Sequence, residues 1–132
     1  FAAPTADALA TLAAEAWIEG CLNETAAAEE ARLAAGEAQG EARGMLAAIA
    51  VDERRHAELA WRVLAWVMSI APDLTRATLA TVPAHVPVSV IDVDPALARH
   101  GVPIEAVKRA ARAYADANAR ERLAQLLDRA RL

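Results

Sequence analysis

The stretch Asp52-Glu53-Arg54-Arg55-His56-Ala57-Glu58-Leu59-Ala60-Trp61 is the most informative part of this sequence, because it places an acid and a histidine on one face of a predicted helix. Glu53 and His56 are three residues apart, so they are neighbours on one face of a helix. A carboxylate on an apolar face is costly unless something pairs with it. The rest of that face is apolar, with Leu46, Ile49, Ala60, Val63 and Val67. The stretch therefore predicts a helix whose inner face carries a polar site.

Outward from this stretch, the sequence predicts a long antiparallel helical hairpin. Helical periodicity extends over about 41–70, and Pro72 ends that helix. A first helix with the same periodicity precedes it over about 5–35, with Thr5 as a suitable N-cap. Between the two helices, the segment 36–40 contains two glycines, which favour a break and a turn.

Glu24 is predicted to face Glu53 across this hairpin. Residues of two antiparallel helices meet when they are equally far from the turn. With the turn centred near Ala38, Glu24 lies 14 residues before it and Glu53 lies 15 residues after it. We therefore expect Glu24 to be buried beside Glu53 and His56, and Glu19, on another stripe, to be exposed. The other members of the Glu24 stripe are apolar or small: Leu9, Ala13, Trp17, Gly20, Cys21, Ala27, Ala28, Ala31 and Ala35.

The composition favours an all-α fold in a single domain. Of the 132 residues, 37 are alanine, the best helix former, and only 4% are aromatic. The hairpin (5–71) is expected to lead into a connection with short helices (72–103), of which 82–93 reads as extended chain. Asp94-Pro95 is typical of a helix start. A C-terminal helix (104–131) is expected to complete the chain.

Charge and cysteine content argue against several classes of protein. The net charge of -4 and the pI of about 5.4 disfavour a nucleic-acid-binding protein, because no basic stripe is available to contact phosphates. The apolar run 57–71 contains charged residues and is shorter than the ~20 residues of a membrane span. Cys21 is the only cysteine, so no disulfide forms within the chain. A reducing cytoplasm is the expected location, although a periplasmic protein without disulfides would have the same cysteine content.

The quoted stretch resembles the second-helix signature of the ferritin-like superfamily of di-iron carboxylate proteins. It is more specifically similar to the second hairpin of bacterial proteins that carry two ferritin-like hairpins in tandem. The likeness covers about residues 10–70 well and residues 98–127 loosely. The matching strings are Glu19-Gly20-Cys21-x-x-Glu24-Thr25-x-Ala27-Ala28 and Asp52-Glu53-x-Arg55-His56-Ala57-Glu58-Leu59-Ala60-Trp61-Arg62. The resemblance implies that Glu24, Glu53 and His56 are metal ligands. It also implies that Asp52 orients a histidine of the other hairpin and that Arg55 donates a structural ion pair.

This resemblance implies a protein that binds two irons, or iron and manganese, and performs redox chemistry of the ferroxidase or peroxidase type. Ferritin-like sites take a Glu from each of two helices and a Glu-x-x-His pair from each of two others. The hairpin at 5–71 supplies half of that set. The other half is expected from a second copy in a homodimer, or from an upstream hairpin of the same chain.

Two other functions are compatible with the same residues. The chain is also readable as a degenerate ferritin-like bundle that only dimerises and carries no activity. A mononuclear zinc site of a hydrolase is a further reading of Glu-x-x-His with one more Glu, although such sites usually hold more than one histidine. The sequence therefore leaves open whether the protein is an enzyme.

Overall fold

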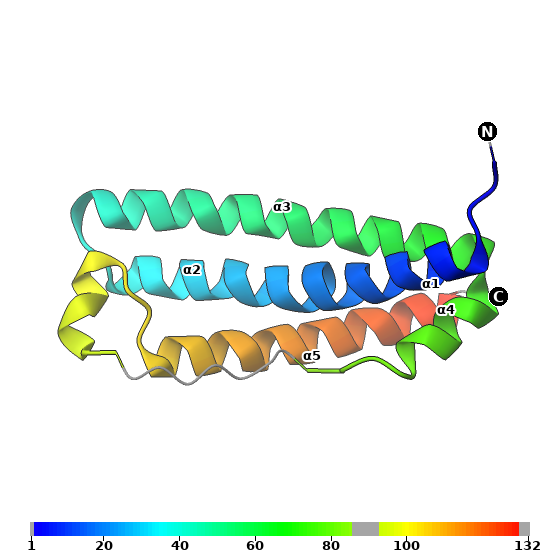
Figure 1. Ribbon diagram of the computed structural model, residues 1–132. Helices are drawn as coiled ribbons and strands as arrows, with labels where there is room; N and C mark the ends of the chain where they lie inside the picture. Colours follow the sequence, from blue (N-terminus) through cyan, green and yellow to red (C-terminus); the bar gives the residue numbers. More distant parts are fainter. Residues whose placement is uncertain (1, 86–92, 130–132) are drawn as a thin grey trace.

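Two long antiparallel helices, with a third long helix beside them, form the body of this protein (Figure 1). The computed structural model describes residues 2–85 and 93–129, and these contain helices and no strand. The elements are α1 (Ala6–Glu15), the π-helix η1 (Ala16–Glu24), α2 (Thr25–Glu37), α3 (Gly40–Ile70), α4 (Pro72–Leu79), the 3-10 helix η2 (Pro95–His100) and α5 (Glu105–Arg129). The predicted all-α hairpin with a C-terminal helix is confirmed.

The first arm of the hairpin, called the first helix below, is continuous over 6–37 because α1, η1 and α2 join without a break. Thr5 caps its start by accepting a hydrogen bond of 3.1 Å from the Ala8 amide. The turn is short, and Gly40 adopts a positive φ of 61° where α3 begins. The turn therefore lies where the two glycines of 36–40 predicted it.

The connection between α4 and α5 packs η2 against the hairpin turn. The backbone N–H of Gln39 donates a 2.9 Å hydrogen bond to the backbone carbonyl of Arg99. Asp94 caps η2 through the Ala96 amide, and Gly101 ends it with a φ of 88°. The predicted short helix at Asp94-Pro95 is thus confirmed, as a 3-10 rather than an α-helix. Most of the predicted extended segment, 86–92, lies outside the described residues.

Small side chains let the two arms of the hairpin approach closely at its centre. A Cβ atom on Gly20 would overlap the Cβ of Ala60 on the opposite arm, so only glycine fits there. Beside this contact, Trp17 and Trp61 pack edge to face with ring centroids 6.0 Å apart. Cys21 is fully buried, and burial raises the pKa of its thiol to about 12, so it is an unreactive core residue.

Helix α5 lies along the first helix and runs in the same direction as α3 (Figure 1). Its buried face is made of small residues, including Ala111, Ala115 and Ala119. It joins α3 through Arg122, which stacks over the Trp61 ring at 4.6 Å from its centroid. The same guanidinium donates to both Glu58 carboxylate oxygens, at 2.6 and 3.2 Å.

The position of α5 corrects the expected inner face of α3. The most buried residues of this helix are Ala50, Ala57, Trp61, Leu64, Val67 and Met68. Ile49, expected on the inner face, is 44% exposed. The reason is that α5 covers the flank of the hairpin that carries Trp61, and no described helix covers the flank that carries Ile49. Among the described residues, no helix has a stretch both long and apolar enough to cross a membrane.

Candidate metal centre

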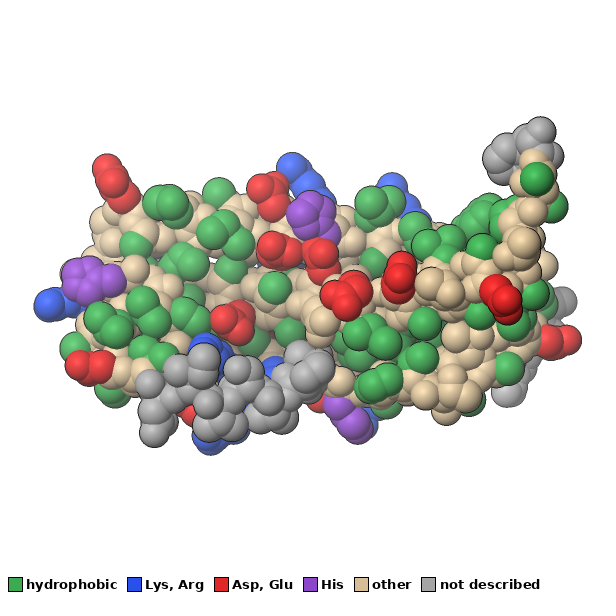
Figure 2. Space-filling view, viewed as in Figure 1, with side chains coloured by type: hydrophobic (Ala, Val, Ile, Leu, Met, Phe, Trp, Pro, Cys, Tyr) green, Lys and Arg blue, Asp and Glu red, His purple; other side chains and the backbone are tan. Residues whose placement is uncertain are grey.

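Glu24, Glu53 and His56 come together between the first helix and α3. Each offers one ligand atom, and these three atoms lie within 4.8 Å of one another. The Nδ1 atom of His56 is 3.0 Å from Glu24 Oε2 and 3.6 Å from Glu53 Oε2. Figure 2 shows acidic side chains and a histidine gathered where the two helices meet. The predicted meeting of Glu24 with Glu53 is therefore confirmed.

Three local features of the sequence place these side chains. The i, i+3 spacing on α3 puts Glu53 and His56 on one face, and the short turn brings Glu24 to their level. Glu24 is also the last residue of the π-helix η1. Such wider turns are uncommon and occur often at functional sites, because they change the direction in which a side chain leaves the helix. The sequence carries no signal that predicts this π-helix, which was expected to be ordinary α-helix.

The cluster is open to solvent on one side. The side chains of Glu24 and Glu53 are 32% and 29% exposed, and that of His56 is 60% exposed. Glu24 was expected to be buried, but within its carboxylate only the Oε2 atom is recorded as buried. Glu19 is exposed, as expected. The expected burial of Glu24 is thus incomplete, since the described chain provides no helix over this flank of the hairpin.

The Oε2 atom of Glu24 is the observation that favours a cation here. It is buried and makes no hydrogen bond among the described residues, although His56 Nδ1 lies 3.0 Å away and forms an ion pair with it when the imidazole is protonated. A buried carboxylate oxygen without a donor is costly. A cation shared with Glu53 and His56 would satisfy it, so two carboxylates and one imidazole fit a metal such as iron or manganese.

Electrostatics at the cluster point the same way. Burial, followed by the neighbouring Glu53 carboxylate, raises the pKa of Glu24, and His56 offsets this only in part. Two carboxylates at this distance repel each other when both are ionised. A bound cation would remove that repulsion, which the described residues relieve only through His56.

Replacing Glu24 by glutamine is expected to stabilise the metal-free protein at pH 7. Because the folded state raises the pKa of Glu24, it binds a proton more tightly than the unfolded chain does. Stability therefore falls as the pH rises from the unfolded pKa of about 4.3 through the folded pKa. Glutamine carries no charge and removes this loss, by less than about 1 kcal/mol for so exposed a side chain.

Urea unfolding of the metal-free protein at several pH values between 4 and 8 measures this effect. Glu19→Gln is the matched control, since Glu19 is an exposed glutamate on the same helix. The interpretation fails if Glu24→Gln is no more stable than the wild type at pH 7, or if both variants change the pH profile equally.

The other predicted residues lie outside the cluster. Asp52 and Arg55 are exposed on α3 and form an ion pair of 3.7 Å with each other. Neither contacts a candidate ligand through an interaction that the described residues show. The remaining histidines do not join the group: His85 approaches Asp116 at 3.4 Å, and His100 accepts from Arg99 at 3.2 Å. Whether Asp52 orients a histidine of another hairpin stays a prediction.

No protein-family description, curated protein or solved structure was found to match this chain.

Proposed function

We propose that this chain binds a pair of iron ions, or iron with manganese, in a ferritin-like site that a second hairpin completes. Glu24, Glu53 and His56 would be its ligands. The buried Glu24 Oε2 atom without a donor carries this proposal, because it lies within reach of an acid and a histidine from the facing helix. Carboxylates and imidazole are the donors that these metals accept.

The uncovered flank of the hairpin supports a partner. Beside Glu53 an open groove of ≈ 260 Å³ is lined by residues of both arms, among them Ala31, Leu46 and Ile49. Nearer the turn, and one helical turn from Ile49 on α3, Met45 is 65% exposed. A second hairpin laid here would cover these apolar side chains and add the missing carboxylates and histidine. A two-fold dimer of this chain would supply both at once, and an upstream hairpin of the same chain is the alternative source.

The proposed activity is redox chemistry in a reducing compartment such as the cytoplasm. A bound metal pair would provide the redox centre at which oxygen or peroxide oxidises Fe(II), or at which peroxide is reduced. The contribution of the chain is to hold the ions and balance their charge with Glu24 and Glu53. His56, exposed at the edge of the cluster, would add a neutral nitrogen ligand.

Excess Fe(II) without oxygen, or excess Mn(II), is expected to raise the melting temperature of the wild type by roughly 10 °C. This corresponds to about 2.7 kcal/mol at a metal concentration 100 times Kd. Glu53→Gln is expected to lose the rise, because it removes a charged ligand, whereas Glu19→Gln keeps it. Thermal melts followed by circular dichroism measure the effect.

Elemental analysis and native mass spectrometry of the same samples distinguish the readings. Two irons per pair of hairpins support the proposed site. A single zinc per chain would indicate the mononuclear site instead. An unchanged melting curve with every metal would favour a structural bundle without a metal, and equal shifts for Glu53→Gln and Glu19→Gln would mean that the metal binds elsewhere.

A further inference from the structure

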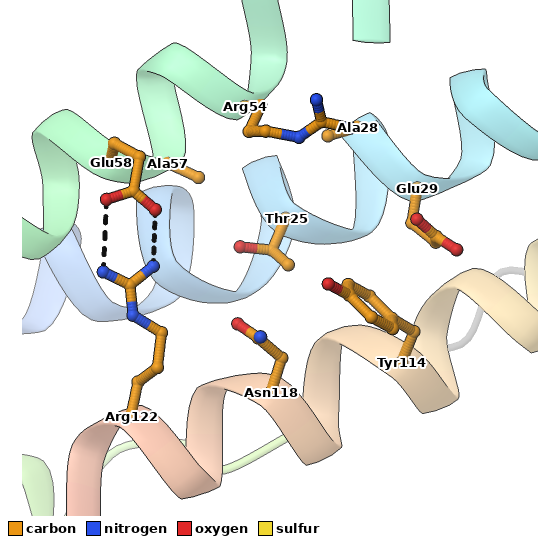
Figure 3. A pocket seen from close by; sticks show the side chains of 9 residues that line it. All are labelled: Thr25, Ala28, Glu29, Arg54, Ala57, Glu58, Tyr114, Asn118 and Arg122. Carbon is orange, nitrogen blue, oxygen red and sulfur yellow. Dashed lines mark hydrogen bonds and ion pairs between the residues drawn. The ribbon is translucent and has the colours of Figure 1, made fainter. Parts of the chain in front are cut away.

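A second polar site lies on the opposite flank of the hairpin, between the first helix, α3 and α5. It is a pocket of ≈ 120 Å³ lined by Thr25, Ala28, Glu29, Arg54, Ala57, Glu58, Tyr114, Asn118 and Arg122 (Figure 3). Thr25, Arg54 and Ala57 each directly follow one of the three candidate metal ligands in the sequence. The pocket therefore lies at the level of the metal centre, but faces α5 instead of the uncovered flank.

The carboxylates of this pocket are already paired. Glu58 accepts both hydrogen bonds of the Arg122 guanidinium. Glu29 accepts two from Arg32, at 2.6 and 2.9 Å, and these lower the pKa of Glu29. Neither carboxylate is therefore free to hold a cation in the pocket.

One positive charge is left over. Arg54 makes no direct ion pair with a carboxylate among the described residues, although its charge helps Arg32 to lower the pKa of Glu29. With Arg32 and Arg122, three guanidinium groups stand against two carboxylates. Arg32 does not line the pocket, but because it and Arg122 hold the two carboxylates, Arg54 is the lining charge that is left without a direct partner.

Three neutral side chains add hydrogen-bond donors. Thr25, Tyr114 and Asn118 extend toward one another from α2 and α5 (Figure 3). Within the described part of the chain, none of their side chains makes a hydrogen bond. The hydroxyls and the amide group all donate as well as accept. Because the acids are already paired, the groups that remain are suited to a ligand rich in acceptors.

We propose that this pocket binds a small oxyanion of the carboxylate or phosphate type. Arg54 would supply the charge, and Thr25, Tyr114 and Asn118 would donate to the oxygens of the anion. The delocalised, negatively charged oxygens of such an anion match the planar guanidinium fork of Arg54. The volume of ≈ 120 Å³ suits an anion of a few heavy atoms.

The test compares Arg54→Gln with Arg55→Gln in the metal-free protein. The two arginines are adjacent on α3, but Arg55 is paired with Asp52 and does not line the pocket. Melting temperatures are measured in sodium phosphate, sodium acetate and sodium chloride at equal ionic strength, and calorimetric titrations give Kd. The wild type and Arg55→Gln are expected to bind phosphate or acetate with the same Kd, and Arg54→Gln to bind at least tenfold more weakly.

Comparing the two arginine variants removes the general effect of phosphate, which stabilises most folded proteins by exclusion from their surface. Tyr114→Phe, which keeps the ring and loses one donor, is expected to weaken binding about fivefold. The phosphate and acetate arms show which type of anion the pocket prefers. The proposal would be overturned if Arg54→Gln and Arg55→Gln responded equally. It would also be overturned if the wild type bound neither anion at a concentration of about 10 mM. Since no metal is present, this result is independent of the proposed metal function.

Discussion

Replacing Gly20 by alanine is expected to destabilise the protein by about 2–3 kcal/mol and to push the two arms of the hairpin apart. The new methyl group would overlap the Ala60 Cβ and lie 3.4 Å from the Ala60 Cα, which is backbone and has no rotamer to change. The arms must therefore separate next to the metal centre. We expect Gly20→Ala to lose metal-induced stabilisation as well, because Glu24 moves away from Glu53 and His56.

Two variants control this experiment. Gly36→Ala adds the same methyl group to the same helix where nothing lies within 4 Å, and it is expected to stabilise by up to about 1 kcal/mol through helix propensity. The double variant Gly20→Ala/Ala60→Gly moves the methyl group to the other arm and is expected to recover most of the loss. Chemical unfolding followed at 222 nm measures all three. If Gly20→Ala is as stable as Gly36→Ala, the arms are not in contact at this point.

Replacing Trp61 by alanine is expected to cost about 3–5 kcal/mol, the largest effect of any single substitution considered for this chain. The side chain is only 6% exposed and lies where three helices meet. Its ring packs on Trp17 and under the Arg122 guanidinium. Alanine would leave a cavity, remove the aromatic pair and take away the surface on which Arg122 stacks beside Glu58.

Trp66→Ala is the matched control for this substitution. It removes the same side chain from the same helix, but Trp66 is 49% exposed, so the expected cost is under about 1 kcal/mol. Urea unfolding is followed by circular dichroism, because either substitution removes a tryptophan and changes the fluorescence. Similar losses for the two variants would show that α5 does not bury Trp61 in solution.

The hairpin and the level of its polar cluster were determined by the sequence. Glycines and prolines set the breaks near residues 38 and 71, and a helix rises by a fixed length per residue. Counting from the turn therefore placed Glu24 beside Glu53, and the i, i+3 spacing added His56. These predictions needed only local rules, which hold for any helix of this length.

Which flank of the hairpin is covered was decided by the tertiary structure. Helical periodicity shows which residues share a face, but not which element packs on it. In α5 the pattern is weak, because alanines such as Ala113 and Ala117 are exposed while Ala115 and Ala119 are buried. Side chains of equal size give no signal of direction.

The pairing of Arg122 with Glu58 joins residues 64 apart, and the pocket beside it exists only because α5 packs on that flank. Ile49 and His56 are exposed because α5 packs on the other flank and no described helix covers theirs. Local rules fix what each helix presents, whereas the burial of each face depends on contacts between segments far apart in the chain.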